Sequence, residues 1–348
     1  MAKPIYWHSG MAGAPQCADA NRNAGNILAA CLVNGFNTQA VSSASAVGGV
    51  LTLNYASDPG FEALSTVNVA GASVAEANGN LRVLSVGSNQ VLLDAPGVPD
   101  GAVGGTIITK YAAAGWTEPF AANTQTRVFR MPGGSQRYFR VYHAVGGYAL
   151  VRGYENMTAL STGTGPFPTT AQQAGNGPAL LYEQAHSTDF GWWCLATDSG
   201  VYMQTFYTTL GYGLGWAYLG DPVQVVKAAD VYAAVACARS GAIPYIARSH
   251  SGTGGAQPVT IPNFYTAQSM TVPSPIANGQ RFLPGVLLEA LNVCRGVLPN
   301  SFLAIPRQAP ELCSTSISDV IGIDGRVRFL HDASSFGTIA IALDEDWA

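Results

Sequence analysis

Five histidines are the first residues to consider for chemistry, because imidazole is the commonest metal ligand and a frequent general base. No two of them have the H-x-H or H-E-x-x-H spacing that brings two imidazoles to one metal ion. His186 lies near Glu183 and Asp189, but a loop with solvated polar side chains explains this group better than a site. The sequence therefore predicts no metal and no cofactor. The histidines are His8, His143, His186, His250 and His331.

Other catalytic patterns are equally weak. The Ser-His-Ser stretch at 249–251 does not make a relay, because the base must be oriented from elsewhere in the fold, and no G-x-S-x-G elbow occurs. The glycine-rich stretches 163–165 and 252–255 lack the Lys-Ser/Thr of a phosphate loop. The carboxylates at 344–346 could bind Ca²⁺, although a solvated acidic end is the simpler explanation. We expect that the chain is not an enzyme.

Aromatic side chains concentrate in residues 191–230, around which the rest of the sequence is organised. The runs 191–197, 201–208 and 216–219 are rich in Trp, Tyr, Phe, Thr and Val, which suit strands, and 198–200 marks a turn. We expect a three-stranded meander at the centre of the main core. The same aromatics could form a platform for a sugar, but such stripes are more often core. The candidate core aromatics are Trp192, Trp193, Tyr202 and Trp216.

The chain carries few charges for its 348 residues. Charged residues make up 11%, whereas an ordinary globular domain has roughly 25%. The net charge of −4 argues against a nucleic-acid partner, since nucleic-acid-binding proteins carry a basic patch. We expect no membrane span and no secretion signal, because no sufficiently long apolar run occurs. A neutral surface of Ser, Thr and Asn would explain the composition, but coverage by other chains explains it better.

The six cysteines include no C-x-x-C pair, so neither a zinc site nor a redox motif is predicted. Without a secretion signal, we expect reduced thiols in a chain made in a cytosol. Most should be buried as small apolar side chains. The cysteines are Cys17, Cys31, Cys194, Cys237, Cys294 and Cys313.

Composition divides the chain into three parts and indicates a mainly β fold. Residues 1–40 and 112–240 are predicted to form a discontinuous main domain, a β-sandwich or meander with one amphipathic helix at 23–34 that ends at a left-handed Gly35. Residues 41–111 contain few aromatics and five short alternating runs separated by turns, which predicts an inserted small β-barrel. Residues 241–348, rich in β-strand signals and proline, should close on the main domain.

Local patterns predict several further elements. The runs 126–131 and 136–142 indicate a hairpin, followed by a strand at 148–152. Residues 156–160 are predicted as one helical turn before a flexible loop at 161–166.

Two later segments complete the predicted elements. Residues 228–238 fit either a helix or a loop followed by a strand. The runs 325–330 and 337–343 predict a closing hairpin.

Six stretches form a set within the first 240 residues: 6–15 (YWHSGMAGAP), 30–36 (ACLVNGF), 152–158 (RGYENMT), 162–168 (TGTGPFP), 218–221 (YLGD) and 229–232 (ADVY). They resemble the corresponding stretches of a family of tailed-bacteriophage virion structural proteins. The resemblance covers most of residues 1–240 and thins beyond them. Residues 41–111 look like that family's small β-barrel insert, which is compared in shape with the FCCH domain of ubiquitin-activating enzymes and implies no ubiquitin chemistry.

The resemblance implies a tail-tip or baseplate subunit that acts by assembly and carries no catalytic residues. Its partners would be other copies of itself, in three- or sixfold rings, and other tail proteins. It would be made in the bacterial host cytoplasm and reside in the virion tail. A receptor- or glycan-binding module that contacts the host cell surface and a head decoration protein are the alternatives. A cell-wall hydrolase would need a carboxylate pair or metal site that the sequence does not show.

Two segments are expected to supply the assembly contacts. The N-terminal arm 2–16 and the proline-rich run 253–284 lack regular patterns, yet they carry apolar side chains that would be exposed in an isolated chain. The candidate contacts are Ile5, Trp7, Ile261 and Phe264.

Overall fold

The protein is mainly β, as the sequence predicts. Strands make up 56% of the computed structural model, which contains one short helix and several antiparallel sheets. The structure describes residues 3–16, 24–123, 125–144, 148–167, 179–182, 190–207, 213–223, 234–239, 245–248, 281–290, 293–305, 318–320, 323–331 and 338–343.

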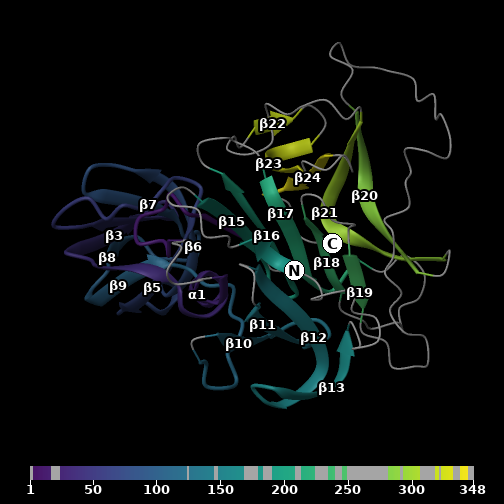
Figure 1. The fold of residues 1–348 in the computed structure, drawn as a ribbon. Coiled ribbons are helices and arrows are strands. Elements are labelled where there is room, and N and C mark those ends of the chain that lie inside the picture. Colours follow the sequence, from purple (N-terminus) through teal and green to yellow (C-terminus); the bar gives the residue numbers. More distant parts are fainter. Residues whose placement is uncertain are drawn as a thin grey trace.

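A six-stranded antiparallel sheet lies at the centre of the molecule (Figure 1). The predicted aromatic meander is confirmed, because three consecutive strands of this sheet, β15, β16 and β17, pair in order. The N-terminal strand pairs with β15 and so forms one edge of the sheet. For residues 228–238 the sequence fits either a helix or a loop followed by a strand. The structure shows a strand at residues 234–239. The strands in spatial order are β1 (Ile5–His8), β15 (Phe190–Ala196), β16 (Gly200–Tyr207), β17 (Gly213–Gly220), β18 (Ala234–Arg239) and β19 (Tyr245–Arg248).

A five-stranded sheet corrects two local predictions. The hairpin of β10 and β11 is confirmed, but the helical turn predicted at 156–160 and the loop predicted at 161–166 are wrong. Residues 156–159 and 162–166 are strand, and residues 160 and 161 form the turn between them. The glycines Gly163 and Gly165 allow β13 to lie close against β12, since a Cβ on Gly163 would lie 2.7 Å from the Asn156 oxygen. The strands are β10 (Thr126–Arg130), β11 (Tyr138–Ala144), β12 (Tyr148–Ala159), β13 (Thr162–Phe167) and β14 (Ala179–Tyr182).

Residues 36–111 form an eight-stranded antiparallel sheet whose strands pair only with one another among the described residues. All five alternating runs noted in the sequence are strands of this sheet. The chain enters and leaves it side by side, since Phe36 and Tyr111 are cross-strand partners. In spatial order the strands are β2 (Phe36–Ala40), β9 (Gly105–Tyr111), β5 (Thr66–Ala72), β6 (Gly79–Val86), β7 (Gln90–Asp94), β4 (Val50–Asn54), β3 (Ser43–Val47) and β8 (Gly101–Ala102). A 3₁₀ turn, η2 (Ala75–Ala77), follows β5.

The C-terminal sheet contains the predicted closing hairpin, in which β23 pairs with β24. It also contacts the central sheet, because the Tyr202 hydroxyl donates to the Pro299 carbonyl oxygen at 2.7 Å. The strands in order are β20 (Arg281–Ala290), β21 (Val293–Ile305), β24 (Thr338–Ala342), β23 (Ile323–His331) and β22 (Ser318–Val320).

The early helix is present over 24–34, while residue 23, where the predicted helix begins, lies outside the described residues. It comprises α1 (Ala24–Ala29) and a π-helical turn, η1 (Ala30–Asn34). Its predicted apolar stripe is buried: Ile27, Leu28, Cys31 and Leu32 are each 0% exposed. Gly35 has φ 68° and ψ 178°. This conformation belongs to glycine alone and differs from the predicted left-handed stop.

One continuous hydrophobic core includes residues from all four sheets and from the helix. Leu51 represents the 36–111 sheet in it, Phe139 the five-stranded sheet, Trp193 the central sheet and Ile341 the C-terminal sheet. A second, smaller cluster of Val128, Tyr154 and Met157 lies in the five-stranded sheet. Shared packing in the larger core therefore joins the four sheets.

Candidate functional site

The four aromatics singled out in the sequence all lie in the core. Trp192, Trp193 and Tyr202 are 0% exposed and Trp216 is 3% exposed. Three of them donate to internal acceptors: Trp192 to the Pro15 carbonyl oxygen, Trp193 to Gln204 Oε1 and Tyr202 to the Pro299 carbonyl oxygen. Side chains this deeply buried cannot serve as a platform for a sugar.

The expectation that Ile5 and Trp7 would be exposed in an isolated chain is wrong. Ile5 is 8% exposed and Trp7 is 0% exposed. The physical reason is that the N-terminal arm is not irregular: residues 5–8 add a strand to the central sheet, opposite residues 193–196 of β15. The other two candidate contacts, Ile261 and Phe264, lie outside the described residues.

Few of the remaining candidates fall on described residues. His8 and His143 are half-buried, and the glycines at 163–165 belong to β13. His186, His250, the stretch 252–255 and the acidic group 344–346 lie outside the described residues. Within the described part of the chain, no three His, Cys, Asp or Glu side chains form a candidate metal site. The same residues include no helix with the length and hydropathy to cross a bilayer.

Two indoles link the central sheet to the segment that leaves the 36–111 sheet. The Trp7 Nε1–H donates to the Ala112 carbonyl oxygen at 2.9 Å. The Trp116 Nε1–H donates to the Thr197 carbonyl oxygen at 2.7 Å, at the end of β15. Both bonds are buried, so each satisfies a carbonyl group that water cannot reach. These two bonds define a junction between the central sheet and residues 112–116.

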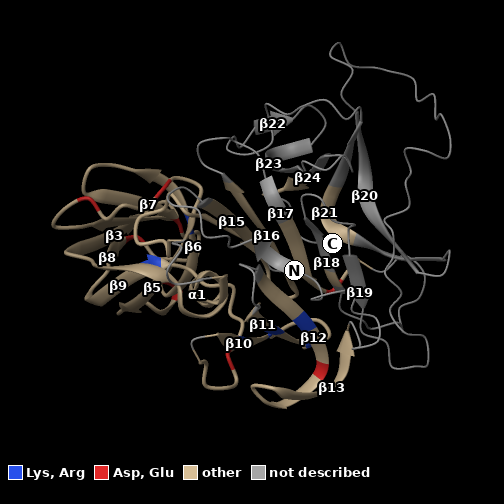
Figure 2. Ribbon diagram, viewed as in Figure 1, with Lys and Arg blue, Asp and Glu red and all other residues tan. Residues whose placement is uncertain are grey.

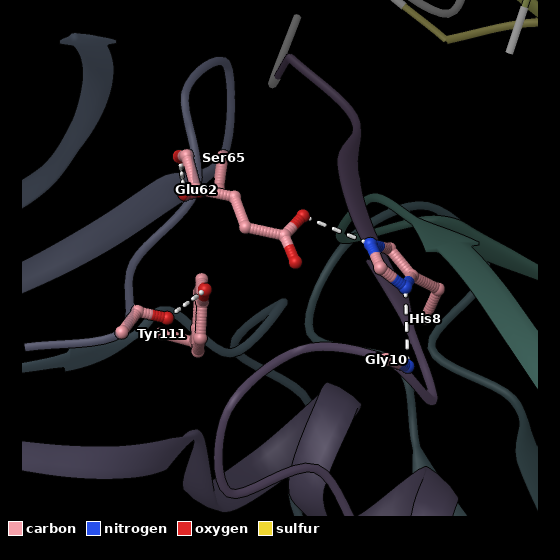
Figure 3. Close-up of polar contacts among 6 residues, drawn as sticks. His8, Gly10, Glu62, Ser65 and Tyr111 are labelled. Atoms are coloured by element: carbon pink, nitrogen blue, oxygen red, sulfur yellow. Dashed lines mark hydrogen bonds and ion pairs between the residues drawn. The ribbon is translucent and has the colours of Figure 1, made fainter. Parts of the chain in front are cut away.

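Next to this junction, the His8 imidazole pairs with the Glu62 carboxylate (Figure 3). His8 Nε2 lies 2.9 Å from Glu62 Oε2, and the Gly10 N–H donates to His8 Nδ1 at 3.2 Å. Because Nδ1 accepts, the proton of the neutral ring resides on Nε2 and is donated to Glu62. The contact joins β1 to the loop before β5.

Two tyrosine hydroxyls make hydrogen bonds that involve the loop before β5. The Tyr111 hydroxyl donates to the Gly60 carbonyl oxygen at 2.9 Å, and burial together with the Glu62 charge raises the pKa of Tyr111. The Tyr55 hydroxyl lies 3.1 Å from Thr109 Oγ1, and burial raises the pKa of Tyr55 to about 12. Both phenols are therefore neutral hydrogen-bonding groups at physiological pH rather than bases.

A cavity of about 360 Å³ lies beside the junction, with Ala113 and Thr197 in its lining. Lys3 and Arg82 are the cations in its lining, Asp198 is the anion, and Ile5 and Ala114 contribute apolar surface. Its size is near the lower end of ligand pockets.

A carboxylate that sequence reasoning missed lies at the end of β17. Asp221 accepts hydrogen bonds from the Ser135 N–H and the Ser135 hydroxyl, both at 2.5 Å. Burial raises the pKa of Asp221, and the neighbouring Asp198 adds to the increase, although the Ser135 bonds oppose it. The Gly134 position is confined by this contact, since a Cβ there would lie 1.9 Å from Asp221 Oδ2. Ser135 and Asp221 are 86 positions apart, so no local sequence signal pairs them.

Two free thiols meet in the core between η1 and β15. Cys31 and Cys194 are both 0% exposed and unbonded, as expected for reduced cysteines. Burial, with contributions from the adjacent Cys194 thiol, raises the pKa of Cys31 well above its usual value. A thiol kept protonated in this way is a poor nucleophile.

The described residues thus offer buried hydrogen bonds between sheets and a cavity of about 360 Å³. Comparison of the chain with protein-family models, curated proteins and solved structures finds no match.

Proposed function

We propose that this chain is a structural subunit of a tailed-phage virion, acting by assembly at the tail tip or baseplate rather than by catalysis. The proposal joins the resemblance of residues 1–240 to that protein family with the physical character of the surface. Its partners would be other copies of the chain and other tail proteins.

One observation carries the proposal: a chain with 11% charged residues exposes large apolar side chains in one region. Isolated soluble chains keep such surface small, and assemblies cover it. Among the described residues, every large hydrophobic side chain that is exposed lies within residues 36–111, in the strands or in the loop before β5. These side chains are Val47 (70%), Leu64 (43%), Leu84 (45%), Val86 (43%) and Ile108 (45%).

The 36–111 sheet would be an inserted small β-barrel. Its strands pair among themselves, and it lies to one side of the other sheets in Figure 1. Because Phe36 and Tyr111 are partners, joining Gly35 directly to Ala112 spans a short gap. We expect a chain without 36–111 to fold and to keep the near-ultraviolet circular dichroism of the buried tryptophans. Loss of that signal would count against an insertion.

Light scattering on the purified full-length chain tests the assembly function. A closed homo-oligomer is expected, since the subunits of a ring make heterologous contacts that close at a fixed number of copies. Gold-labelled antibodies against the 36–111 sheet should then bind intact particles at the tail tip. A stable monomer at high concentration, together with unlabelled particles, would refute the proposal.

A further inference from the structure

The cavity beside the junction lies between two sheets, and both of them contribute to its lining. Arg82 and its cross-strand partner Thr66 belong to the 36–111 sheet. Ile5 and its cross-strand partner Ala196 belong to the central sheet. Charged positions are sparse along the described ribbon in Figure 2, yet three of them line this one cavity. A site that gathers charges in a charge-poor protein is a candidate for recognition.

Hydrogen bonds hold the walls of the cavity in place. The Ala112 N–H donates to the Thr66 carbonyl oxygen at 3.0 Å, which ties the connecting segment to the 36–111 sheet. The Trp116 indole ties the same segment to the end of β15. The Gly133 N–H donates to the Asp198 carbonyl oxygen at 3.1 Å, which fixes the turn that carries the Asp198 side chain. Walls that are already ordered lose little entropy when a ligand binds.

Two opposite charges in the lining do not neutralise each other. Among the described residues, the Lys3 ammonium and the Asp198 carboxylate make no hydrogen bond or ion pair, so they lie more than 4.0 Å apart. The third charged residue, Arg82, lies opposite Asp94 of β7, where an opposite charge offsets its own. The cavity therefore presents one positive and one negative group to a ligand.

A second carboxyl group reinforces the negative end of the cavity. Burial is the main cause of the raised pKa of Asp221, and the charge of Asp198 adds to it, so the two carboxyl groups interact. A Cβ on Gly133 would lie 2.8 Å from Asp198 Oδ2, which places this oxygen beside the turn that also contacts Asp221. A ligand ammonium group at Asp198 would be attracted by both carboxylates.

Neutral hydrogen-bonding groups and apolar side chains complete the lining. Asn80 Oδ1 accepts a hydrogen bond from Asn68 Nδ2 at 2.8 Å, which leaves the Asn80 amino group as a donor. The Thr66 hydroxyl can accept as well as donate. Together they match the carbonyl oxygen and the N–H of one peptide bond. Ile5 and Ala114 offer apolar surface to small side chains.

The same lining disfavours other ligand classes. An anion without a cationic group would be repelled by Asp198. A metal ion would be repelled by Lys3 and would meet a single carboxylate, whereas Ca²⁺ takes several oxygen ligands. A sugar platform uses aromatic rings, and none lies among the described lining residues. The volume of about 360 Å³ requires a small ligand.

We propose that this cavity binds a short zwitterionic peptide, with its ammonium group at Asp198 and its carboxylate at Lys3. Small apolar side chains of the peptide lie against Ile5 and Ala114. The proposal is independent of the assembly function, because the whole site belongs to one chain. Since the lining comes from two sheets, a bound peptide also strengthens the attachment of the 36–111 sheet to the central sheet.

Isothermal titration calorimetry of the full chain with dialanine tests the proposal. Two blocked peptides of the same backbone separate the two charges. N-acetyl-dialanine lacks the ammonium group and dialanine amide lacks the carboxylate, so each should bind about tenfold more weakly than dialanine. The difference should shrink as salt is added, because the charged groups are partly exposed.

Single variants assign each charge to its partner. Asp198→Asn should remove the preference for dialanine over N-acetyl-dialanine and keep the preference over the amide, and Lys3→Gln should do the reverse. A purely structural role would not change one preference and keep the other. Glu76→Gln, which removes a carboxylate from η2 outside the cavity, should leave both preferences unchanged. Ala113→Leu, which places a larger side chain in the cavity, should abolish binding.

Several results would overturn the proposal. No binding of any of the three peptides at millimolar concentration would show that the cavity is not a peptide site. Equal affinity for dialanine and N-acetyl-dialanine would show that Asp198 recognises no ammonium group, and equal affinity for dialanine and its amide would exclude Lys3 in the same way. Unchanged binding by a folded Ala113→Leu variant would place the peptide elsewhere. None of these results bears on self-association, which light scattering measures separately.

Discussion

The row of aromatic rings across the five-stranded sheet contains one gap, at Gly153, and filling it should destabilise the protein. Gly153 pairs with Phe139 on one side and Phe167 on the other. The two rings approach edge to face with centroids 6.0 Å apart, above the glycine. A Cβ on Gly153 would lie 2.0 Å from Phe167 Cε2, so the Phe167 ring must move.

The expected size of the effect combines opposing terms. Overpacking of a core costs about 1–3 kcal/mol, and disturbing an edge-to-face pair costs about 0.5–1.5 kcal/mol more. Replacing a glycine within a strand by alanine stabilises the folded state by about 0.5–1 kcal/mol, which opposes these costs. We therefore expect Gly153→Ala to lower the free energy of unfolding by about 1–3 kcal/mol.

Urea unfolding followed by circular dichroism measures this change. Gly97→Ala is the matched control, because its new methyl group would meet nothing closer than 3.9 Å. Phe167→Leu should make room for the methyl group, so the double variant should be more stable than the sum of the single effects by about 1 kcal/mol. Equal stability of Gly153→Ala and Gly97→Ala, or strict additivity in the double variant, would refute the assigned packing.

Two further predictions concern polar contacts. Asp221→Asn should remove a pH dependence: a carboxyl with a raised folded pKa stabilises the fold below its unfolded pKa, and that contribution is lost as pH rises through the folded value. The free energy of unfolding of the wild type, minus that of the variant, should therefore fall as the pH rises above about 4, the ordinary pKa of an aspartate. Thermal unfolding at several pH values checks this, and a constant difference would contradict it. Trp7→Phe should cost about 1–3 kcal/mol, because the buried Ala112 carbonyl loses its indole donor. Urea unfolding measures this, and unchanged stability would show that water replaces the donor.

The strands were predictable from sequence wherever one face is buried. The runs 81–86, 126–131 and 191–197 all lie largely in strands, β6, β10 and β15, because their apolar and aromatic side chains suit a pleated surface. The strand β13 escaped prediction because its sequence, Thr-Gly-Thr-Gly-Pro-Phe, has the composition of a loop. Its glycines serve close approach to β12, which only the pairing reveals.

The candidate sites were harder to predict, because their contacts join residues distant in sequence. His8 and Glu62 are separated by 54 positions, and Ser135 and Asp221 by 86. Neither pair has a local pattern, since each depends on how two sheets meet. The burial of Trp7 was misjudged for the same reason: a four-residue edge strand gains its partner from a strand more than 180 positions later.

The side-by-side attachment of the 36–111 sheet has a mechanical consequence. A pull on its exposed apolar side chains would load both connecting strands together at Phe36 and Tyr111. The same place is cross-braced, because Lys110 Nζ donates to the Asn34 carbonyl oxygen at 2.5 Å and the Trp7 indole binds Ala112. Tension would therefore be shared across the attachment and transmitted to the central sheet without unzipping the eight strands in sequence.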